Sequence, residues 1–232
     1  MTAPGFTISI DPVDTLMFRD GRPFSQADPG ASRAVSVFPP FPPTMVGTVR
    51  FALLGALGTW RADLLGDGTD WQDPATLGPL TFGGPLVLYR GAPVFPVPLH
   101  VLEGRDAAGT EILTRLSPGR ERNCDMGAAR LPVPDRKLAG LKPVEDRWVT
   151  VQGLQTILEG GVPASSELVD VRERLWVVEP RVGIGITPGN RTTSGGHLYM
   201  ASHVRVREDV RLCCELHGYT GPRPGGVVVQ TM

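Results

Sequence analysis

The chain has 232 residues, with 23 basic and 24 acidic side chains and a formal net charge of −1. This length and a hydrophobic content of 41% suffice for one ordinary globular unit with a sizeable core. No apolar run reaches the ~18 residues of a membrane-spanning helix, and the N-terminus lacks the pattern of a signal peptide. Three cysteines are too few for a disulfide framework or a closed zinc site, so we expect a cytoplasmic protein without metal or cofactor.

The first half of the chain predicts a strand, a helix and a hairpin. Thr7–Ile10 alternate as in a short strand. Met45–Leu57 are apolar at helical spacing, and Thr44 is expected to cap this helix after a run of prolines. A hairpin is expected over residues 86–97, with its turn at Arg90–Ala92.

The second half predicts a further helix and more strands. Trp148–Leu158 have helical spacing, and Arg174–Ile186 form a β segment that a proline interrupts. Leu198–Arg207 and Val210–Tyr219 alternate and are expected to pair. The order predicts an α+β fold: a single domain with a ferredoxin-like β-α-β-β-α-β module, large insertions and an additional C-terminal β-hairpin.

The basic residues are almost all arginine, with only two lysines among 23. Arginine contacts phosphate in a planar, two-pronged way and stacks on bases. Between Arg115 and Lys142, seven basic residues accompany three acidic ones in a segment rich in proline and glycine. We therefore expect a basic insertion around residues 101–147 that is not regular core. Residues 183–196 combine glycines, hydroxyls and one arginine, and predict either a loop that wraps phosphate or a solvated hairpin tip.

Two further arginines flank a tight turn near the first strand. Arg19 and Arg22 lie on either side of Asp20-Gly21. They are expected either to form ion pairs with Asp14 and Asp20, or to meet phosphate together with Arg50 at the predicted helix.

Several segments resemble a known family. Residues 18–24 read F-R-D-G-R-P-F, and residues 38–50 form a proline-rich run that leads into a small-residue helix ending in arginine. Residues 84–99, 181–186 and 196–199 are similar to the family in kind and order. Together they resemble the third RAMP subunit of the type III-B CRISPR effector, the Cmr complex, in the Cas-five-like group.

The resemblance implies a non-catalytic RNA-binding subunit of an antiviral ribonucleoprotein complex. In the family this subunit binds the 5′ repeat-derived tag of the CRISPR RNA, beside the large Cas-ten-type subunit and a backbone RAMP subunit. A projecting thumb there separates tag from guide, and position and charge make the basic insertion our candidate for it. Family members are usually longer, with a second ferredoxin-like half, so we expect a compact version or a missing half on another polypeptide.

The residues expected to contact RNA come from the turn, the helix, the insertion and the glycine-rich loop. They are Arg19, Arg22, Arg50, Arg120, Arg122, Arg130, Arg136, Lys137, Arg191, Thr192 and Thr193. The alternative is a metal-independent endoribonuclease that processes CRISPR repeat RNA, with His197 or His100 as acid or base. A third possibility, a purely protein–protein scaffold, would contact no RNA.

Overall fold

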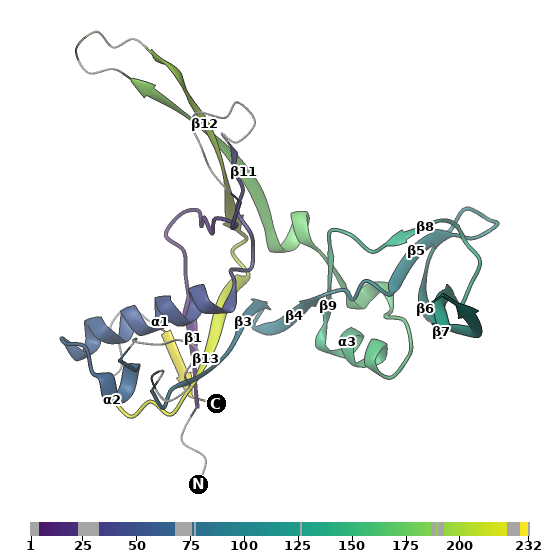
Figure 1. The fold of residues 1–232 in the computed structure, drawn as a ribbon, viewed down its shortest axis with the longest axis horizontal. Helices are drawn as coiled ribbons and strands as arrows, with labels where there is room; N and C mark the ends of the chain where they lie inside the picture. Colours follow the sequence, from purple (N-terminus) through teal and green to yellow (C-terminus); the bar gives the residue numbers. More distant parts are fainter. Residues whose placement is uncertain are drawn as a thin grey trace. The chain divides into compact units, whose positions relative to one another are not determined.

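The computed structural model describes residues 5–22, 33–67, 76, 78–125, 127–186, 189, 193–221 and 228–231. The chain divides into two compact units, which Figure 1 shows in the colours of the sequence. Unit 1 comprises residues 1–91 and 176–232, and unit 2 comprises residues 92–175. Unit 2 is therefore an insertion into the sequence of unit 1, and it contains the whole basic segment.

Unit 1 is built on an antiparallel sheet in the order β3-β13-β1-β14. Its strands are β1 (Gly5–Ile10), β3 (Thr81–Tyr89), β13 (Val210–His217) and β14 (Val228–Thr231). Helix α1 (Pro42–Leu57) packs against β3 and buries Met45, Val49 and Leu53 along one stripe. A four-residue helix, α2 (Ala62–Leu65), follows it.

Helix α1 confirms the helix expected from apolar spacing, but it begins earlier. Pro42 and Pro43 occupy its first turn, where a missing backbone N–H costs nothing. Phe41 is the N-cap residue, so the prediction of Thr44 as the cap is wrong. Gly58 ends the helix with φ 72°, a conformation that glycine adopts without strain.

A second sheet of unit 1 has the order β11-β12-β2. It consists of β11 (Trp176–Ile186), β12 (Thr193–Val206) and the short β2 (Arg33–Ala34). Strand β11 is antiparallel to β12, and β2 is parallel to β12. Strand β11 runs through Pro180 without a break, because an edge strand tolerates a residue that cannot donate a ladder hydrogen bond.

The C-terminal strands do not form the expected hairpin. Strand β12 pairs with β11, whereas β13 lies between β1 and β3 in the other sheet. Alternation fixes the face that each residue occupies but not which strand lies next to it. The expected loop over residues 183–196 is also shorter than predicted, because β11 continues to Ile186 and β12 begins at Thr193.

Unit 2 also contains two sheets. One has the order β10-β9-β4, from β4 (Ala92–Pro96), β9 (Arg147–Thr150) and β10 (Leu168–Asp170). The other has the order β7-β6-β5-β8, from β5 (Val101–Arg105), β6 (Glu111–Cys124), β7 (Gly127–Pro134) and β8 (Ala139–Pro143). The core of unit 2 gathers Val97, Val101, Val144, Val149 and Ile157.

The predicted helix of residues 148–158 is divided between a strand and a helix. Strand β9 ends at Thr150, and α3 spans Val151–Leu158. The hydroxyl of Thr150 accepts a hydrogen bond from the backbone N–H of Gly153 at 3.3 Å and so caps α3. A short 3-10 helix (Ser165–Glu167) and a π-helical turn (Val171–Leu175) complete unit 2.

The basic segment, which we expected not to be regular core, does form regular strands, β6, β7 and β8, but most of their side chains beyond Ser117 are exposed. Its prolines and glycines are accommodated within the ribbon of β6 and β7. Pro118 and Pro132 face each other across the ribbon, and the register shifts between Pro118 and Glu121. Gly119 lies in this bulge, where a Cβ would come within 2.9 Å of the Leu131 carbonyl oxygen.

The described elements, a few helices with mainly antiparallel strands, confirm the α+β class. The helix that the sequence analysis placed second in the ferredoxin-like module is α3, which belongs to unit 2. Only residues 218–227 connect β13 to β14 in unit 1. Among the described residues, no helix is long and apolar enough to cross a membrane.

Candidate nucleic-acid interface

Two cations lie together on one face of the β6–β7 ribbon. Arg120 and Arg122 are two residues apart on β6, so their side chains lie on the same face. Within the described part of the chain, neither has an acidic partner. Arg130 on β7 pairs in register with Glu121 and therefore lies on the opposite face, where its Nε is 3.8 Å from the Glu121 carboxylate. The ribbon thus has one face with two unpaired cations and one face with an ion pair.

The face that carries Arg120 and Arg122 also exposes aliphatic side chains. Ala129 on β7 pairs in register with Arg122. Leu131 and Val133 follow Ala129 at every second position, so they lie on the same face as Arg122. Their exposed fractions are 63% and 45%. This face therefore offers cations for phosphate beside apolar groups for sugars or bases.

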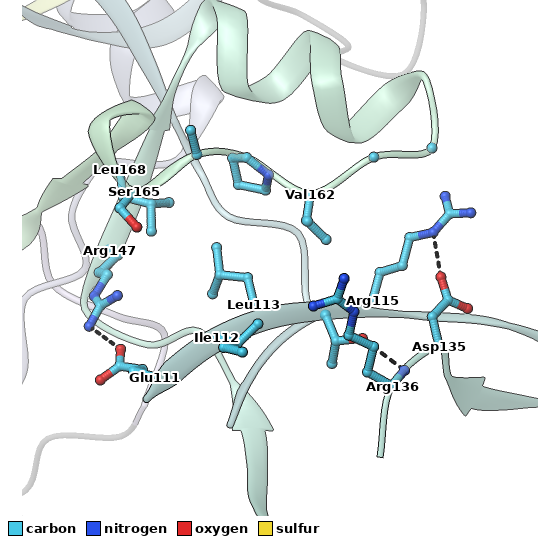
Figure 2. A pocket seen from close by; sticks show the side chains of 15 residues that line it. Glu111, Ile112, Leu113, Arg115, Asp135, Arg136, Arg147, Val162, Ser165 and Leu168 are labelled. Atoms are coloured by element: carbon cyan, nitrogen blue, oxygen red, sulfur yellow. Dashed lines mark hydrogen bonds and ion pairs between the residues drawn. The ribbon is translucent and has the colours of Figure 1, made fainter. Parts of the chain in front are cut away.

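Two more cations follow the end of β7. Arg136 donates its backbone N–H to the hydroxyl of Thr114 at 3.2 Å, which fixes its backbone to β6. Figure 2 shows the Arg136 side chain directed into a pocket. No ion pair occupies the side chain of Arg136 or of its neighbour Lys137 in the ranges that the structure describes.

The pocket lies wholly within unit 2 and has a volume of about 490 Å³. Its walls come from the start of β6 (residues 111–115), the bend at Asp135–Arg136 and the segment 160–165 after α3. Ile112, Leu113 and Leu168 give it an apolar floor, and Val162 faces them in Figure 2. Leu113 and Leu168 also pack against the core of unit 2, so the floor is part of the rigid fold.

Carboxylates neutralise the other two arginines of the pocket. The Nε of Arg115 is 2.9 Å from Asp135, and an Nη of Arg147 is 2.8 Å from Glu111. Hydrogen bonds from Ser117 and then Arg115 lower the pKa of Asp135, and Arg147 lowers the pKa of Glu111. Both carboxylates are therefore ionised at neutral pH.

The arginines near the first strand form local contacts. Arg22 Nε is 2.6 Å from Asp20, and an Nη of Arg19 donates to the Arg22 carbonyl at 3.0 Å. Of the two alternatives for these arginines, the ion pair between Arg22 and Asp20 is present. Asp14 instead accepts from Arg181 and Arg205, which together lower its pKa.

The remaining predicted RNA contacts lie in α1 and β12. Arg50 on α1 places its guanidinium 5.5 Å from the ring centroid of Phe82 on β3 and is half-buried. Arg191 and Thr192 lie outside the described residues. Thr193 begins β12, but its side chain lies outside the description.

The histidines do not gather with other polar groups into a catalytic arrangement in the described part of the chain. His203 Nδ1 is 3.0 Å from the Thr15 hydroxyl, and His217 Nε2 is 3.8 Å from Glu215. His100 is exposed in the turn before β5, and the side chain of His197 lies outside the description. No group of His, Cys, Asp and Glu among the described side chains could hold a metal ion.

The sequence analysis missed an apolar face on β11. Val178, Val182, Ile184 and Ile186 share this face with Pro180, which lies between the two valines, and they are 53% to 63% exposed. The opposite face carries Glu179 and Arg181, which are ion-paired. The signal was present in the sequence, since apolar residues alternate from Val178 to Ile186, but alternation alone does not show which face is covered.

Comparison with known proteins places this fold. A family model described as CRISPR-associated protein (Cas_Cmr3) matches residues 8–225, and the chain therefore belongs to this family. The resemblance to a Cmr subunit that the motifs indicated is confirmed. Among curated proteins, no sequence matches the chain.

Two solved structures also match. A chain of the Type III-B Cmr-beta bound to cognate target RNA and AMPPnP, determined by cryo-EM, has a TM-score of 0.50 and 17% identity, over 93% of this chain and 54% of that chain. A chain of the Type III-B Cmr-beta bound to cognate target RNA has a TM-score of 0.48 and 17% identity, over 90% and 54%. The chain thus spans about half the length of these solved chains.

Proposed function

We propose that the chain is a non-catalytic, RNA-binding subunit of a type III-B CRISPR effector and holds the 5′ tag of the CRISPR RNA. The observation that carries this proposal is the group of four exposed cations on the β6–β7 ribbon and the bend that follows it, Arg120, Arg122, Arg136 and Lys137, none of which has an acidic partner in the described structure. Membership of the Cas_Cmr3 family supports it. The structure with a TM-score of 0.50 is of a complex bound to target RNA, which is consistent with this role.

The distribution of ion pairs favours unit 2 as the RNA-binding part. In unit 1, Arg22, Arg90, Arg181, Arg205 and Arg211 each lie within ion-pair distance of a carboxylate. An arginine that already faces a carboxylate contributes less net attraction to a phosphate than an unpaired one. Among the described residues, we therefore assign the attraction for RNA mainly to the β6–β7 ribbon and the bend that follows it.

The sheet of unit 1 supports a ferredoxin-like module. The order β3-β13-β1-β14, fully antiparallel, is that of a β-α-β-β-α-β fold in which α1 is the first crossover. In this assignment unit 2 and the β11–β12 pair are insertions between the second and third strands. We assign the β6–β7 ribbon as the thumb between tag and guide.

The subunit acts in the cytoplasm within a hetero-oligomer that includes the large Cas-ten-type subunit and backbone RAMP subunits. The apolar face of β11 supports protein docking, because Val178, Val182, Ile184 and Ile186 offer no charge to a phosphate. A face of this kind is typical of a surface that another protein covers.

The test is RNA capture by the assembled complex. Replacing Arg120, Arg122, Arg136 and Lys137 with alanine should weaken capture of tagged RNA while the complex still assembles. Unchanged capture would contradict the proposal. Incubating the chain with repeat RNA in chelator tests the endoribonuclease alternative, since cleavage abolished by His197→Ala or His100→Ala would establish that activity instead.

A further inference from the structure

We propose that the pocket of unit 2 takes a single nucleotide that is turned out of the bound RNA strand. The phosphodiester lies on Arg136, and the base lies over Ile112, Leu113 and Leu168. This inference rests on the proposed RNA binding and adds a defined subsite to it.

The size of the pocket fits one nucleotide. Its volume of about 490 Å³ lies within the range of sites that enclose small organic ligands. Strand β6 forms one side, and the segment 160–165 forms the other, as Figure 2 shows. A base inserted between them would be covered on both faces, whereas a base stacked within a strand would not enter.

The charge of the pocket fits one phosphodiester. Asp135 and Glu111 hold Arg115 and Arg147, so Arg136 alone among the lining arginines keeps its charge available. One guanidinium matches the single negative charge of a phosphate within a strand. A free nucleoside diphosphate or triphosphate carries several charges and would need several unpaired cations.

The floor of the pocket fits a base. Leu113 and Leu168 pack against the core of unit 2, so they present a fixed apolar surface. The guanidinium of Arg115 lies against Gly160, where a Cβ would come within 2.7 Å of its Nη1. Glycine therefore lets a planar cation form one end of the cleft, and such a plane can stack on a base.

The position of Arg136 links the pocket to the rest of the RNA surface. It follows β7 directly, and its backbone is bound to Thr114 of β6. A strand that contacts Arg120 and Arg122 on the ribbon thus reaches the pocket by following β7. Single-stranded RNA is commonly recognised by such splayed bases.

The experiment combines filling the pocket with removing the base. Val162 lines the pocket and is 38% exposed, so Val162→Trp can occupy the cavity without entering the core. Ala164→Trp, at another exposed lining position, is the second filling variant. The probe is single-stranded tagged RNA, either intact or with one abasic nucleotide placed at each tag position in turn.

For the unmodified chain, one abasic position should weaken binding about tenfold, and this penalty should disappear in the filled variants. Arg136→Ala should weaken binding about fivefold at 0.1 M salt. Arg174→Ala, which removes an exposed arginine of unit 2 outside the pocket lining, is the matched control and should change binding less than twofold.

The possible failures are distinguishable. If the complex assembled with the unmodified chain captures no tagged RNA, the proposed function fails and the pocket assignment fails with it. If RNA binds, but the loss of affinity at every abasic position is the same in the folded, filled variants as in the unmodified chain, the pocket assignment alone is wrong. If a nucleoside monophosphate binds in an Arg136-dependent way without competing with RNA, the pocket serves a free nucleotide and the assignment is likewise overturned.

Discussion

The two unpaired arginines of the β6–β7 ribbon make a quantitative prediction about salt. Arg120 and Arg122 share one exposed face of β6, so replacing both with alanine removes two charges without opening the core. If each contacts one phosphate, the double variant binds RNA with two fewer released counterions. Its affinity should therefore depend less steeply on salt than that of the unmodified chain.

The magnitude follows from the slope for single-stranded nucleic acid, about 0.7 per phosphate in log K against log salt. Two contacts change the slope by about 1.4. Relative to 1 M salt, where both proteins should bind alike, the double variant should bind about 25-fold more weakly at 0.1 M. Fluorescence anisotropy with labelled, tagged RNA across this range measures both quantities.

Arg130→Ala is the matched control on the same ribbon. Arg130 lies on the opposite face, and Glu121 offsets its charge at 3.8 Å. Replacing Arg130 should change the slope of log K against log salt by less than half of the change that the double variant shows. A double-variant defect that persists unchanged at 1 M salt would refute the reasoning, because it would show that the two arginines do not act through phosphate charge.

Two further predictions concern the apolar face of β11 and the cysteines. The double variant Val182→Asp with Ile184→Asp should leave the melting temperature of the isolated chain nearly unchanged, since both residues are more than half exposed. It should prevent copurification with the effector subunits. Intact copurification would contradict protein docking by this face. At pH 8, a maleimide should label exposed Cys124 but not Cys213 or Cys214 in the folded chain, because both are buried and burial raises the pKa of both thiols, for Cys214 to about 11. Mass spectrometry that finds all three labelled without denaturant would contradict this.

Periodicity predicted the elements of this fold better than their partners. The apolar stripe of α1 was visible in the sequence because burial of Met45, Val49 and Leu53 follows helical spacing. The partner of β12 was not, because an alternating strand pairs equally well with any neighbour whose apolar face matches. The prolines were also placed wrongly, because a sequence does not show which backbone N–H groups the fold uses. Pro42 lies in the first turn of a helix and Pro180 lies in an edge strand. Neither position needs a backbone N–H, which only the neighbouring elements show.

The sequence shows which residues of the candidate site are basic, but it does not show which of them lack a carboxylate partner. The sequence marks Arg122 and Arg130 as equally basic, and only the strand register shows that one faces no carboxylate of the described structure while the other faces Glu121. The pocket was not predictable at all. Its two sides, residues 111–115 and 160–168, are far apart in the sequence and meet only because both pack on the core of unit 2.

The near-neutral net charge of the chain therefore gives little information about RNA binding. What matters is where cations without a carboxylate partner lie together, and four such residues, Arg120, Arg122, Arg136 and Lys137, lie on the β6–β7 ribbon and the bend that follows it. Four contacts at about 0.7 each strengthen binding about 600-fold at 0.1 M salt relative to 1 M, or about 4 kcal/mol. An increment of this size supports only weak binding by the isolated chain. The same contacts become effective within an assembly, where neighbouring subunits hold the RNA at high local concentration, so tight binding of the tag should require the complex.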